Sequence, residues 1–471
     1  MVDSKPGANT VWPEAPAKVT HIPFVTTGAY PVRAGNRVHP LIDGEPAFRR
    51  LCEAMDQAQA RVWVTVTFLW ASFQMPDGRG SFFDVLTRAR QRGLDVRVLF
   101  WRPDEATAHL RTNAFWGSHA HVALLEQRAS AISIRWDRAH PGFCQHQKLW
   151  LIDAGLETAC AFVGGINLNP HSLVAPGHRG SEHNHDLYLE ISGSTVTDVH
   201  HNFVQRWNEA SERNEADGRW GPEADHDLAF PDGVAAARGP TVAQVQRTIH
   251  PGRYANTHPT PGGTPFAIAD GEFSNRDQYV HAIRAAREYI YLENQAISVR
   301  PVLEELVAAV ERGVAVVLVL PTVASSIDAP ADPRDGLFRD ERRTLARTSH
   351  FTLAGLAGRD ANGARHPVHV HAKLMIIDDV WATVGSCNLH RYSMYGNGEL
   401  NIAFADAVAV RALRCELLAE HLEQDTSALD GRSALRVFRT VAEQNAERRH
   451  RGDPDWEGIA CAMDPLQWWA S

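Results

Sequence analysis

Two copies of one short pattern bring together residue types that are suited to chemistry on a phosphate. The pattern His-x-Lys-x4-Asp occurs first at His146, Lys148 and Asp153, and again at His371, Lys373 and Asp378. Side chains two positions apart on a strand point to the same face, so each histidine projects together with its lysine. An imidazole can attack or move a proton, and an ammonium can neutralise an anion. Each aspartate lies an odd number of residues from its histidine, so we expect it at the following turn, accepting backbone or side-chain donors.

Lysine is rare in this chain, which makes the two copies improbable as a coincidence. Only four of the 47 basic residues are lysines, and two of these four lie in the pattern. Wherever the chain needs only a positive charge it uses arginine, so a lysine inside the chain indicates a site that requires an ammonium. The alternative, two ordinary strand histidines beside surface lysines, is therefore disfavoured.

Each copy is followed by a turn of small residues and an asparagine. The first copy continues into VGGIN, which contains Gly165 and Asn167, and the second into VGSCN, which contains Ser386 and Asn388. Small residues let backbone N–H groups approach an anion, and an asparagine amide adds a neutral donor. We therefore expect these four residues to form a phosphate cradle.

A carboxylate opens a strand further along each half, Asp186 in HNHDLYLEI and Glu399 in GNGELNIAF. Such a carboxylate can bind the second nitrogen of a catalytic imidazole and fix its tautomer. We predict that each serves its own half, with Asp186 orienting His146 and Glu399 orienting His371. A solvent-facing carboxylate at the start of a strand is the alternative.

The elements that must position these residues are themselves duplicated. Residues 41–69 and 268–295 both run from Asp-Gly-Glu through an amphipathic helix into an alternating strand. A second helix ending in Arg-Gly and a second strand follow in each half. Strands that alternate with helices predict an α/β fold, with two similar α/β/α sandwich lobes that arise from an internal duplication.

The register of the duplication is maintained over a whole half. Asp43 precedes His146 by 103 residues, and Asp270 precedes His371 by 101 residues. We predict a first lobe over residues 37–213, a connector that contributes one strand over 214–264, a second lobe over 265–424 and a C-terminal extension over 425–471. The connector is assigned because it is rich in Gly, Pro, Asp and Ala, apart from the strand-like run TVAQVQRTI.

Composition limits the classes of protein that this chain could be. Its 471 residues are 44% hydrophobic, as in an ordinary globular protein, and the net charge of −9 argues against nucleic acid as a partner. No apolar stretch approaches the roughly 20 residues that a membrane helix needs. The first residues lack the basic-then-apolar order of a signal peptide. We expect a cytoplasmic protein or one peripheral to a membrane, or a secreted one if a leader has been removed.

Two groups of potential metal ligands were weighed. The six cysteines are far apart and no pair has CxxC spacing, so we expect reduced thiols. His178, His183 and His185 lie close together in PGHRGSEHNHD. A metal site is one interpretation, but no cysteine or second cluster completes it in the sequence, and we favour a solvated or substrate-contacting loop.

The doubled motif, with GG after the first copy and GS after the second, resembles the phospholipase D superfamily, and most closely its bacterial phospholipases D and phosphatidyltransferases. The second copy carries the stronger likeness, in VHAKLMIIDDVWATVGSCNLHRYSMYGNGELNIAF, and YIYLENQ is a further similar phrase. The resemblance covers roughly residues 40–424. It implies a monomer in which two lobes related by a pseudo-twofold axis bring both His-Lys pairs to one active site at their interface.

The resemblance also implies a reaction that uses no metal or other cofactor. One histidine would form a phosphohistidine while the other protonates the leaving alcohol, and the lysines and asparagines would neutralise the phosphate oxygens. We predict His146 as the nucleophile and His371 as the general acid, because the GG turn leaves more room beside the first histidine than Ser386 leaves beside the second. The likeness to bacterial phospholipases D points the same way.

The predicted function is hydrolysis of glycerophospholipid head groups at a membrane surface, together with transphosphatidylation, with water or a small alcohol as acceptor. Three alternatives stay open. One is cardiolipin synthase-like transfer between two lipids, and another is a superfamily nuclease acting on DNA or RNA, which the acidic balance disfavours. The third is a non-catalytic binding module, which would have little reason to retain both complete motifs.

Overall fold

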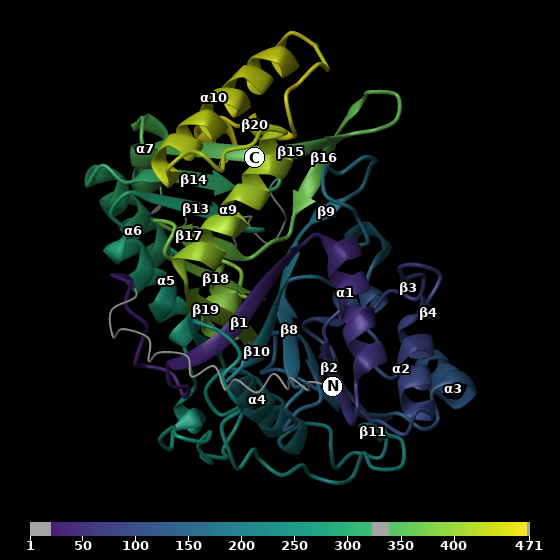
Figure 1. Ribbon diagram of the computed structural model, residues 1–471. Helices are drawn as coiled ribbons and strands as arrows, with labels where there is room; N and C mark the ends of the chain where they lie inside the picture. The colour runs from purple at the N-terminus through teal and green to yellow at the C-terminus, as the bar shows by residue number, and fades with distance from the viewer. Residues whose placement is uncertain (1–19, 323–338, 469–471) are drawn as a thin grey trace, which may run out of the picture.

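The computed structural model describes residues 20–322 and 339–468 (Figure 1). The N-terminal residues on which the leader prediction rests, and the last three residues of the predicted C-terminal extension, lie outside this part of the chain. Within it, no helix is long and apolar enough to cross a membrane. All six cysteines are free thiols, as predicted.

The first half is built on a mixed sheet. Its strands lie in the spatial order β11 (Arg219–Trp220), β6 (Ser133–Asp137), β5 (Asp95–Trp101), β2 (Arg61–Val66), β7 (Lys148–Ile152), β8 (Cys160–Gly164), β10 (Leu187–Gly193) and β1 (Arg33–Ile42). Strand β2 is parallel to β5 and antiparallel to β7. The motif strand β7 therefore lies near the centre of the sheet.

The second half repeats this order. Its strands are β12 (Thr241–Thr248), β19 (Glu399–Ala405), β18 (Trp381–Gly385), β17 (Leu374–Ile377), β13 (Tyr289–Glu293), β14 (Ala315–Val319) and β15 (Phe351–Arg359), and β15 then pairs with both β16 (Arg365–Val370) and β20 (Ala460–Ala462). Here β13 is parallel to β14 and antiparallel to the motif strand β17, as β2 is to β5 and β7. The predicted duplication is confirmed strand by strand.

Strands β1 and β12 join the two sheets. They pair antiparallel, with Arg33 opposite Ala243 and Asn36 opposite Thr241. The strand predicted inside the connector is therefore present, but by its place in the order it is the second lobe's equivalent of β1. The second lobe begins earlier in the chain than residue 265, because the sequence shows that a strand exists but not which strand it pairs with.

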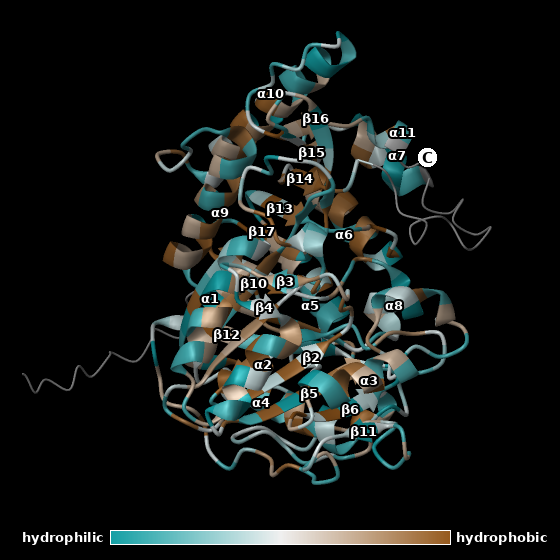
Figure 2. Ribbon diagram, turned by 90° about the vertical axis from the view of Figure 1, so that its right-hand side faces the viewer, coloured by the Kyte–Doolittle hydropathy of each residue, from teal (hydrophilic) through white to brown (hydrophobic). Residues whose placement is uncertain are grey.

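The helices cover both faces of each sheet, giving the predicted α/β/α lobes (Figures 1 and 2). They are α1 (Gly44–Gln57), α2 (Phe82–Gln91), α3 (His119–Arg128), α4 (Val196–Asn208), α5 (Ser274–Ala285), α6 (Arg300–Glu311), α7 (Arg339–Arg347), α8 (Arg391–Tyr395), α9 (Ala407–Leu422), α10 (Gly431–His450) and α11 (Pro465–Trp468). In the first lobe α1 and α2 pack on one face and α4 on the other. In the second lobe α5 and α6 pack on one face, and α9 and α10 on the other.

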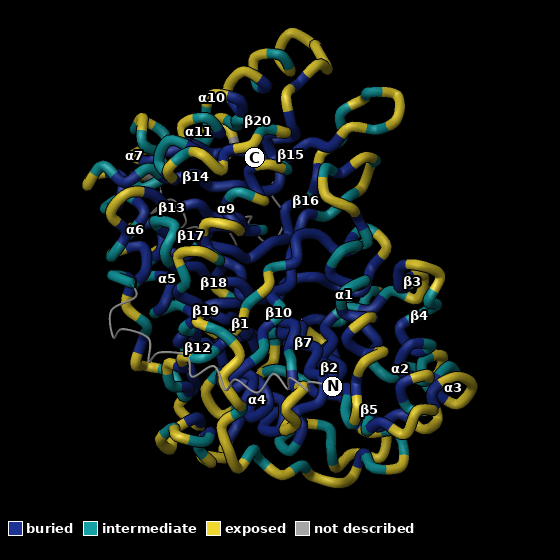
Figure 3. Tube along the Cα trace, viewed as in Figure 1, coloured by how far each residue is buried: buried dark blue, intermediate teal, exposed yellow. Residues whose placement is uncertain are grey.

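The local sequence explains why these elements begin and end where they do. At α2, Ser81 accepts a hydrogen bond from the Asp84 N–H, and the Asp84 carboxylate accepts one from the Ser81 N–H, which is a capping box. Gly93 follows the helix with φ 89°, a conformation suited to glycine at a helix end. The strands between the helices are almost continuously buried, as Figure 3 shows in dark blue. Sheets covered on both faces need such apolar strands.

The C-terminal extension is an integral part of the second lobe. Helix α10 packs against β20, and β20 adds antiparallel to β15. A short pair of strands, β3 (Gln74–Met75) and β4 (Gly80–Ser81), precedes α2, and β9 (Asn184–His185) pairs parallel with β16 across the two lobes. Three 3-10 helices complete the described elements, η1 (Ala108–Asn113), η2 (Pro170–Ser172) and η3 (Ile268–Asp270).

Candidate active site

Both motif histidines lie where the lobes meet. His146 directly precedes β7, and its N–H donates to the carbonyl of Gly398 in the second lobe at 2.8 Å. His371 precedes β17, and its N–H donates to the carbonyl of His185 in the first lobe, also at 2.8 Å. The two histidines are only 7% and 8% exposed. The interface that the sequence predicted is thus the place where both His-Lys pairs come together.

The carboxylate partners of the histidines are exchanged between the lobes. Nδ1 of His146 lies 3.0 Å from Oε2 of Glu399, and Nδ1 of His371 lies 2.6 Å from Oδ2 of Asp186. The predicted pairing within each half is therefore wrong. The reason is that each histidine stands at the lobe boundary and its ring faces the strand start of the opposite lobe. Among the described residues no hydrogen bond engages either Nε2, so both outer nitrogens are available to a substrate.

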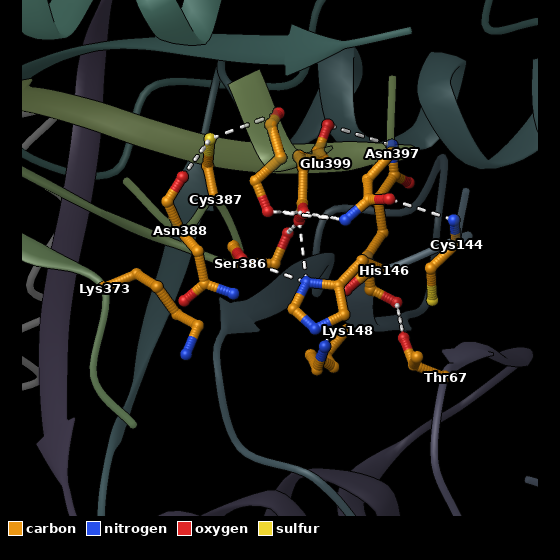
Figure 4. A network of polar contacts seen from close by, with 12 residues as sticks. Thr67, Cys144, His146, Lys148, Lys373, Ser386, Cys387, Asn388, Asn397 and Glu399 are labelled. Atoms are coloured by element: carbon orange, nitrogen blue, oxygen red, sulfur yellow. Dashed lines mark hydrogen bonds and ion pairs between the residues drawn. The ribbon is translucent and has the colours of Figure 1, made fainter. Parts of the chain in front are cut away.

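The two lysines are buried beside the histidines. Lys148 Nζ donates to the carbonyl of His146 at 2.8 Å, and Lys373 Nζ donates to the carbonyl of His371. Burial lowers the pKa of Lys148 to about 8 and that of Lys373 to about 7. Figure 4 shows Lys373 and Asn388 to one side of the His146 ring, with Glu399 on the other. Ammonium groups with so little solvation gain strongly when an anion arrives.

Asn167 and Asn388 are both present at this centre as buried amides. They are 7% and 3% exposed, and within the described part of the chain neither amide oxygen has a hydrogen-bond partner. Buried amides are normally satisfied, so an unpaired pair next to two ammonium groups indicates a place for a ligand. This agrees with the predicted cradle.

Gly165 and Ser386, predicted to contact phosphate, instead support the carboxylates. The Gly165 N–H donates to the carbonyl of Leu187, and the Ser386 N–H donates to that of Leu400, so neither is free for an anion. A methyl group at Gly165 would lie 2.3 Å from an Asp186 oxygen. Ser386 Oγ donates to Glu399 at 2.5 Å. These two roles replace the predicted phosphate contacts.

This placement also removes one reason for the predicted division of labour. The space that Gly165 leaves lies beside Asp186, the partner of His371, and Ser386 lies beside the partner of His146. The argument that the GG turn gives His146 more room is therefore wrong. It assumed that each turn adjoins the histidine of its own half.

Glu399 is held by several donors at once. Besides His146 and Ser386, it accepts hydrogen bonds from Ser393 Oγ at 2.5 Å and Asn397 Nδ2 at 3.3 Å. Burial pushes the pKa of Glu399 upward, but His146 and the other donors hold it below its ordinary value. Ser393 and Asn397 were not singled out from the sequence, although their polar run directly before Glu399 could have indicated them.

Asp186 has a poorer set of partners. Apart from His371, its carboxylate accepts the N–H of Leu187 at 2.9 Å. Burial raises the pKa of Asp186 to about 7. Burial also lowers the pKa of both histidines, and that of His371 falls well below its usual value, with Lys373 adding to the effect.

The motif aspartates lie away from this centre. Asp153 follows the far end of β7 with φ 52°, and its carboxylate accepts the N–H groups of Gln59, Ala60 and Arg61 and the hydroxyl of Thr158. Asp378 follows β17 with φ 54° and accepts the N–H groups of residues 287–289. The turn position was predicted correctly. The inclusion of these aspartates in the catalytic set needs correction, because each binds the start of the neighbouring strand instead.

The histidine-rich loop also differs from its prediction. His178 and His185 are completely buried, and only His183 is partly exposed. Their partners are carboxylates from distant parts of the chain, which the sequence alone could not bring together. The loop is therefore neither solvated nor open to substrate at these two positions.

The comparisons with known proteins agree with this architecture. The chain matches the family described as "Cardiolipin synthase, PLD-like domain" over residues 51–207 and 279–421, which is more than half of its length. It also matches "Phospholipase D" over residues 171–298. The chain therefore belongs to the phospholipase D superfamily, as its motifs indicated.

Individual relatives are distant. Phospholipase D alpha 2 of Oryza sativa subsp. japonica is 25% identical, with 70% of this chain and 55% of the rice protein aligned. Cardiolipin synthase A of Pseudomonas entomophila is 24% identical over 81% of this chain and 68% of its own length. The chain thus spans little more than half of its first plant relatives.

A solved structure shares the fold. The phosphatidylserine synthase of Haemophilus influenzae Rd KW20 superposes with a TM-score of 0.54 at 13% identity, covering 91% of this chain and 88% of that protein. At this identity the likeness concerns the fold alone. It supports the reading of the two halves as one continuous architecture.

Proposed function

We propose that this protein cleaves the head-group phosphodiester of glycerophospholipids at a membrane surface, and that it transfers the phosphatidyl group to water or to a small alcohol. The observation that carries this proposal is the meeting of two His–carboxylate pairs and two buried lysines at one interface. Because both halves of the site belong to one chain, a monomer suffices. Its family relatives include enzymes named for phospholipid substrates, which supports a lipid over other phosphodiesters.

The reaction divides between the two histidines. Nε2 of His146 attacks phosphorus, the bond from phosphorus to the head-group oxygen breaks, and Nε2–H of His371 protonates the departing alcohol. His371 then takes a proton from water or an acceptor alcohol, whose oxygen attacks phosphorus and releases His146. Throughout, Lys148 and Lys373 neutralise the non-bridging oxygens, a task that other phosphoryl-transfer sites give to magnesium.

His146 is assigned as the nucleophile from the way its partner is held. Glu399 accepts hydrogen bonds from Ser386, Ser393 and Asn397, and these donors favour its ionised form. An ionised Glu399 accepts the Nδ1–H of His146 and so leaves the Nε2 lone pair free to attack. His371 is then the general acid and Asp186 its orienting group.

Transfer between two lipids, as the name cardiolipin synthase describes, is the second candidate. The family match of most of both lobes favours it. It uses the same attack on phosphorus and differs only in the acceptor, which would be the hydroxyl of a second lipid in place of water. The two candidates therefore share the intermediate and separate in their products.

One panel tests these proposals. The enzyme is incubated with phosphatidylcholine, with phosphatidylglycerol and with single-stranded DNA, each with and without added glycerol, and the products are separated. We expect phosphatidic acid, or a transferred phosphatidyl group, from a lipid and no DNA cleavage. His366→Ala, a partly exposed histidine paired with Asp360, is the control that should keep activity, whereas His146→Ala should lose it. Cleavage of DNA with no lipid product would overturn the proposal.

A further inference from the structure

Behind the catalytic centre lies a second group of polar side chains that the proposed reaction does not use. Asp43 stands at the turn between β1 and α1, His178 and His185 lie on the loop between β8 and β10, and Glu420 lies on α9 of the opposite lobe. One ligand-type atom from each lies within 4.8 Å of those of the other three. Their side chains are between 0% and 5% exposed.

The separations between these atoms are those of ligands around one ion. Nε2 of His178 lies 3.4 Å from Nδ1 of His185, 3.2 Å from Oδ2 of Asp43 and 3.3 Å from Oε1 of Glu420. Zinc–nitrogen and zinc–oxygen bonds of about 2.0–2.1 Å in a tetrahedron place the ligand atoms about 3.3 Å apart. The two imidazole nitrogens point at each other, as two ligands of a shared cation do.

Hydrogen bonds alone leave this cluster incompletely satisfied. Nε2 of His178 faces three partners and can carry only one hydrogen. Within the described chain, Asp43 Oδ2 and Glu420 Oε2 accept no hydrogen bond although both are buried. Buried carboxylate oxygens without partners are costly unless a cation compensates them.

The surroundings of His185 complete the pattern. Its other ring nitrogen, Nε2, lies 3.0 Å from Oε2 of Glu293, and Glu293 also accepts the hydroxyl hydrogen of Tyr291 at 2.6 Å. Metal-bound histidines usually donate their second N–H to a carboxylate, which fixes the ring and turns the first nitrogen to the ion. Here that arrangement directs Nδ1 of His185 toward Asp43 and His178.

We propose that Asp43, His178, His185 and Glu420 bind one zinc ion that joins the two lobes. Two imidazoles and two carboxylates suit zinc better than magnesium or calcium, which prefer oxygen ligands and retained water. Four protein ligands in a buried setting close the coordination sphere, so the ion is structural and takes no part in the reaction at phosphorus.

The site connects directly to one half of the catalytic centre. The Asp43 N–H donates to the carbonyl of Asp186 at 2.8 Å, and the Asp186 N–H donates to Oδ1 of Asp43 at 3.3 Å. The carbonyl of His185 accepts the N–H of His371. The zinc ligands thus hold the backbone that places the His371–Asp186 pair. The second half has no equivalent, because Asp270, the counterpart of Asp43, is exposed.

Metal content measured on the full chain tests the proposal independently of its activity. The protein is produced with zinc, freed of loosely bound ions with a weak chelator, and analysed by plasma mass spectrometry; we expect roughly one zinc per chain. His178→Ala and Glu420→Gln should weaken zinc binding at least about 100-fold. His183→Ala, from the same loop but outside the ligand set, and His371→Ala, from the catalytic centre, should retain the ion.

A second measurement covers variants that do not fold. Zinc is stripped from the wild-type protein with a strong chelator and added back, and its return should raise Tm, because the ion binds the folded state. Cobalt in its place should give the visible absorption of a four-coordinate site. A wild-type protein that contains no zinc and gains no stability from it would overturn the proposal. So would zinc that stays in folded His178→Ala and Glu420→Gln but is lost from His371→Ala.

Discussion

The two half-sites contain the same histidine and lysine but differ in the carboxylate that each histidine contacts. Glu399, beside His146, accepts hydrogen bonds from two serine hydroxyls and one asparagine amide. Asp186, beside His371, has a backbone N–H and the open space over Gly165. The duplication has kept the reacting groups and changed their support. Two identical imidazoles can therefore take different roles.

The lobes differ in the same sense around their Asp-Gly-Glu segments. In the first lobe Asp43 is buried and Glu45 is partly exposed, whereas in the second lobe Asp270 is exposed and Glu272 is buried against Arg247. The same three-residue phrase thus supplies a different buried acid in each half. Equivalent positions in a duplicated protein do not imply equivalent functions.

Removing either histidine gives the largest expected effect and separates their roles. His146→Ala and His371→Ala should each lower kcat by at least roughly 10²- to 10⁴-fold on a natural lipid. With a substrate whose leaving group needs no protonation, His371→Ala should still form a covalent phosphoenzyme that turns over slowly, and His146→Ala should form none. Trapping and peptide mapping of the labelled histidine make the measurement. A label on His371 in the wild-type enzyme would reverse the assignment.

Removing the charge of each carboxylate tests the exchanged pairing. We expect roughly 10²- to 10⁴-fold losses from Glu399→Gln and from Asp186→Asn, because each amide no longer stabilises the required imidazole tautomer. A better leaving group should restore Asp186→Asn, which affects the acid, but not Glu399→Gln, which affects the attack. If Glu399→Gln were the restored variant, Glu399 would serve the acid and the proposed roles would fail.

Exchanging the turn residues probes the supports themselves. Gly165→Ala places a methyl group 2.3 Å from an Asp186 oxygen and should displace that carboxylate, with a loss resembling Asp186→Asn. Ser386→Gly makes the second turn like the first and removes one hydrogen bond to a charged group, about 1.5–3 kcal/mol, or roughly 10- to 100-fold in rate. Steady-state kinetics on one lipid suffice. Full activity in both variants would show that the turns do not position the carboxylates.

The lysines predict the pH dependence. In the free enzyme Lys373 has a pKa of about 7 and Lys148 of about 8, so both carry their charge below these values and lose it as the pH rises. Because kcat/KM reports the free enzyme, it should fall as the pH rises through 7 to 8, approaching tenfold per unit for each charge lost. Protonation of His146, whose pKa burial lowers, should limit activity only in more acidic solution. A flat profile between pH 6 and 9 would contradict this.

The motif aspartates should affect stability and hardly affect catalysis. Asp153→Asn loses charge-assisted hydrogen bonds to three backbone N–H groups and a threonine, and Asp378→Asn loses a similar set. We expect each to lower the free energy of unfolding by about 1–3 kcal/mol while kcat stays within a fewfold of the wild-type value. Chemical denaturation and steady-state assays make the comparison. A large fall in kcat with unchanged stability would return the aspartates to the catalytic set.

Much of this protein is determined by its sequence alone. The doubled motif in a chain with four lysines, the repeated helix–strand order and the constant spacing between Asp-Gly-Glu and the histidines identified the family, the α/β lobes and their meeting place. These features depend on residues close together in the chain or on periodicity along it, and both can be read without coordinates.

The tertiary structure decided which groups meet across the lobes. It exchanged the carboxylates between His146 and His371, turned Gly165 and Ser386 from phosphate contacts into supports, and paired β12 with β1. It also gathered Asp43, His178, His185 and Glu420, which are separated by up to 377 positions, around one point. Such contacts arise from the packing of one folded lobe against another. A pattern along the chain records each residue's neighbours in sequence and carries no record of that packing.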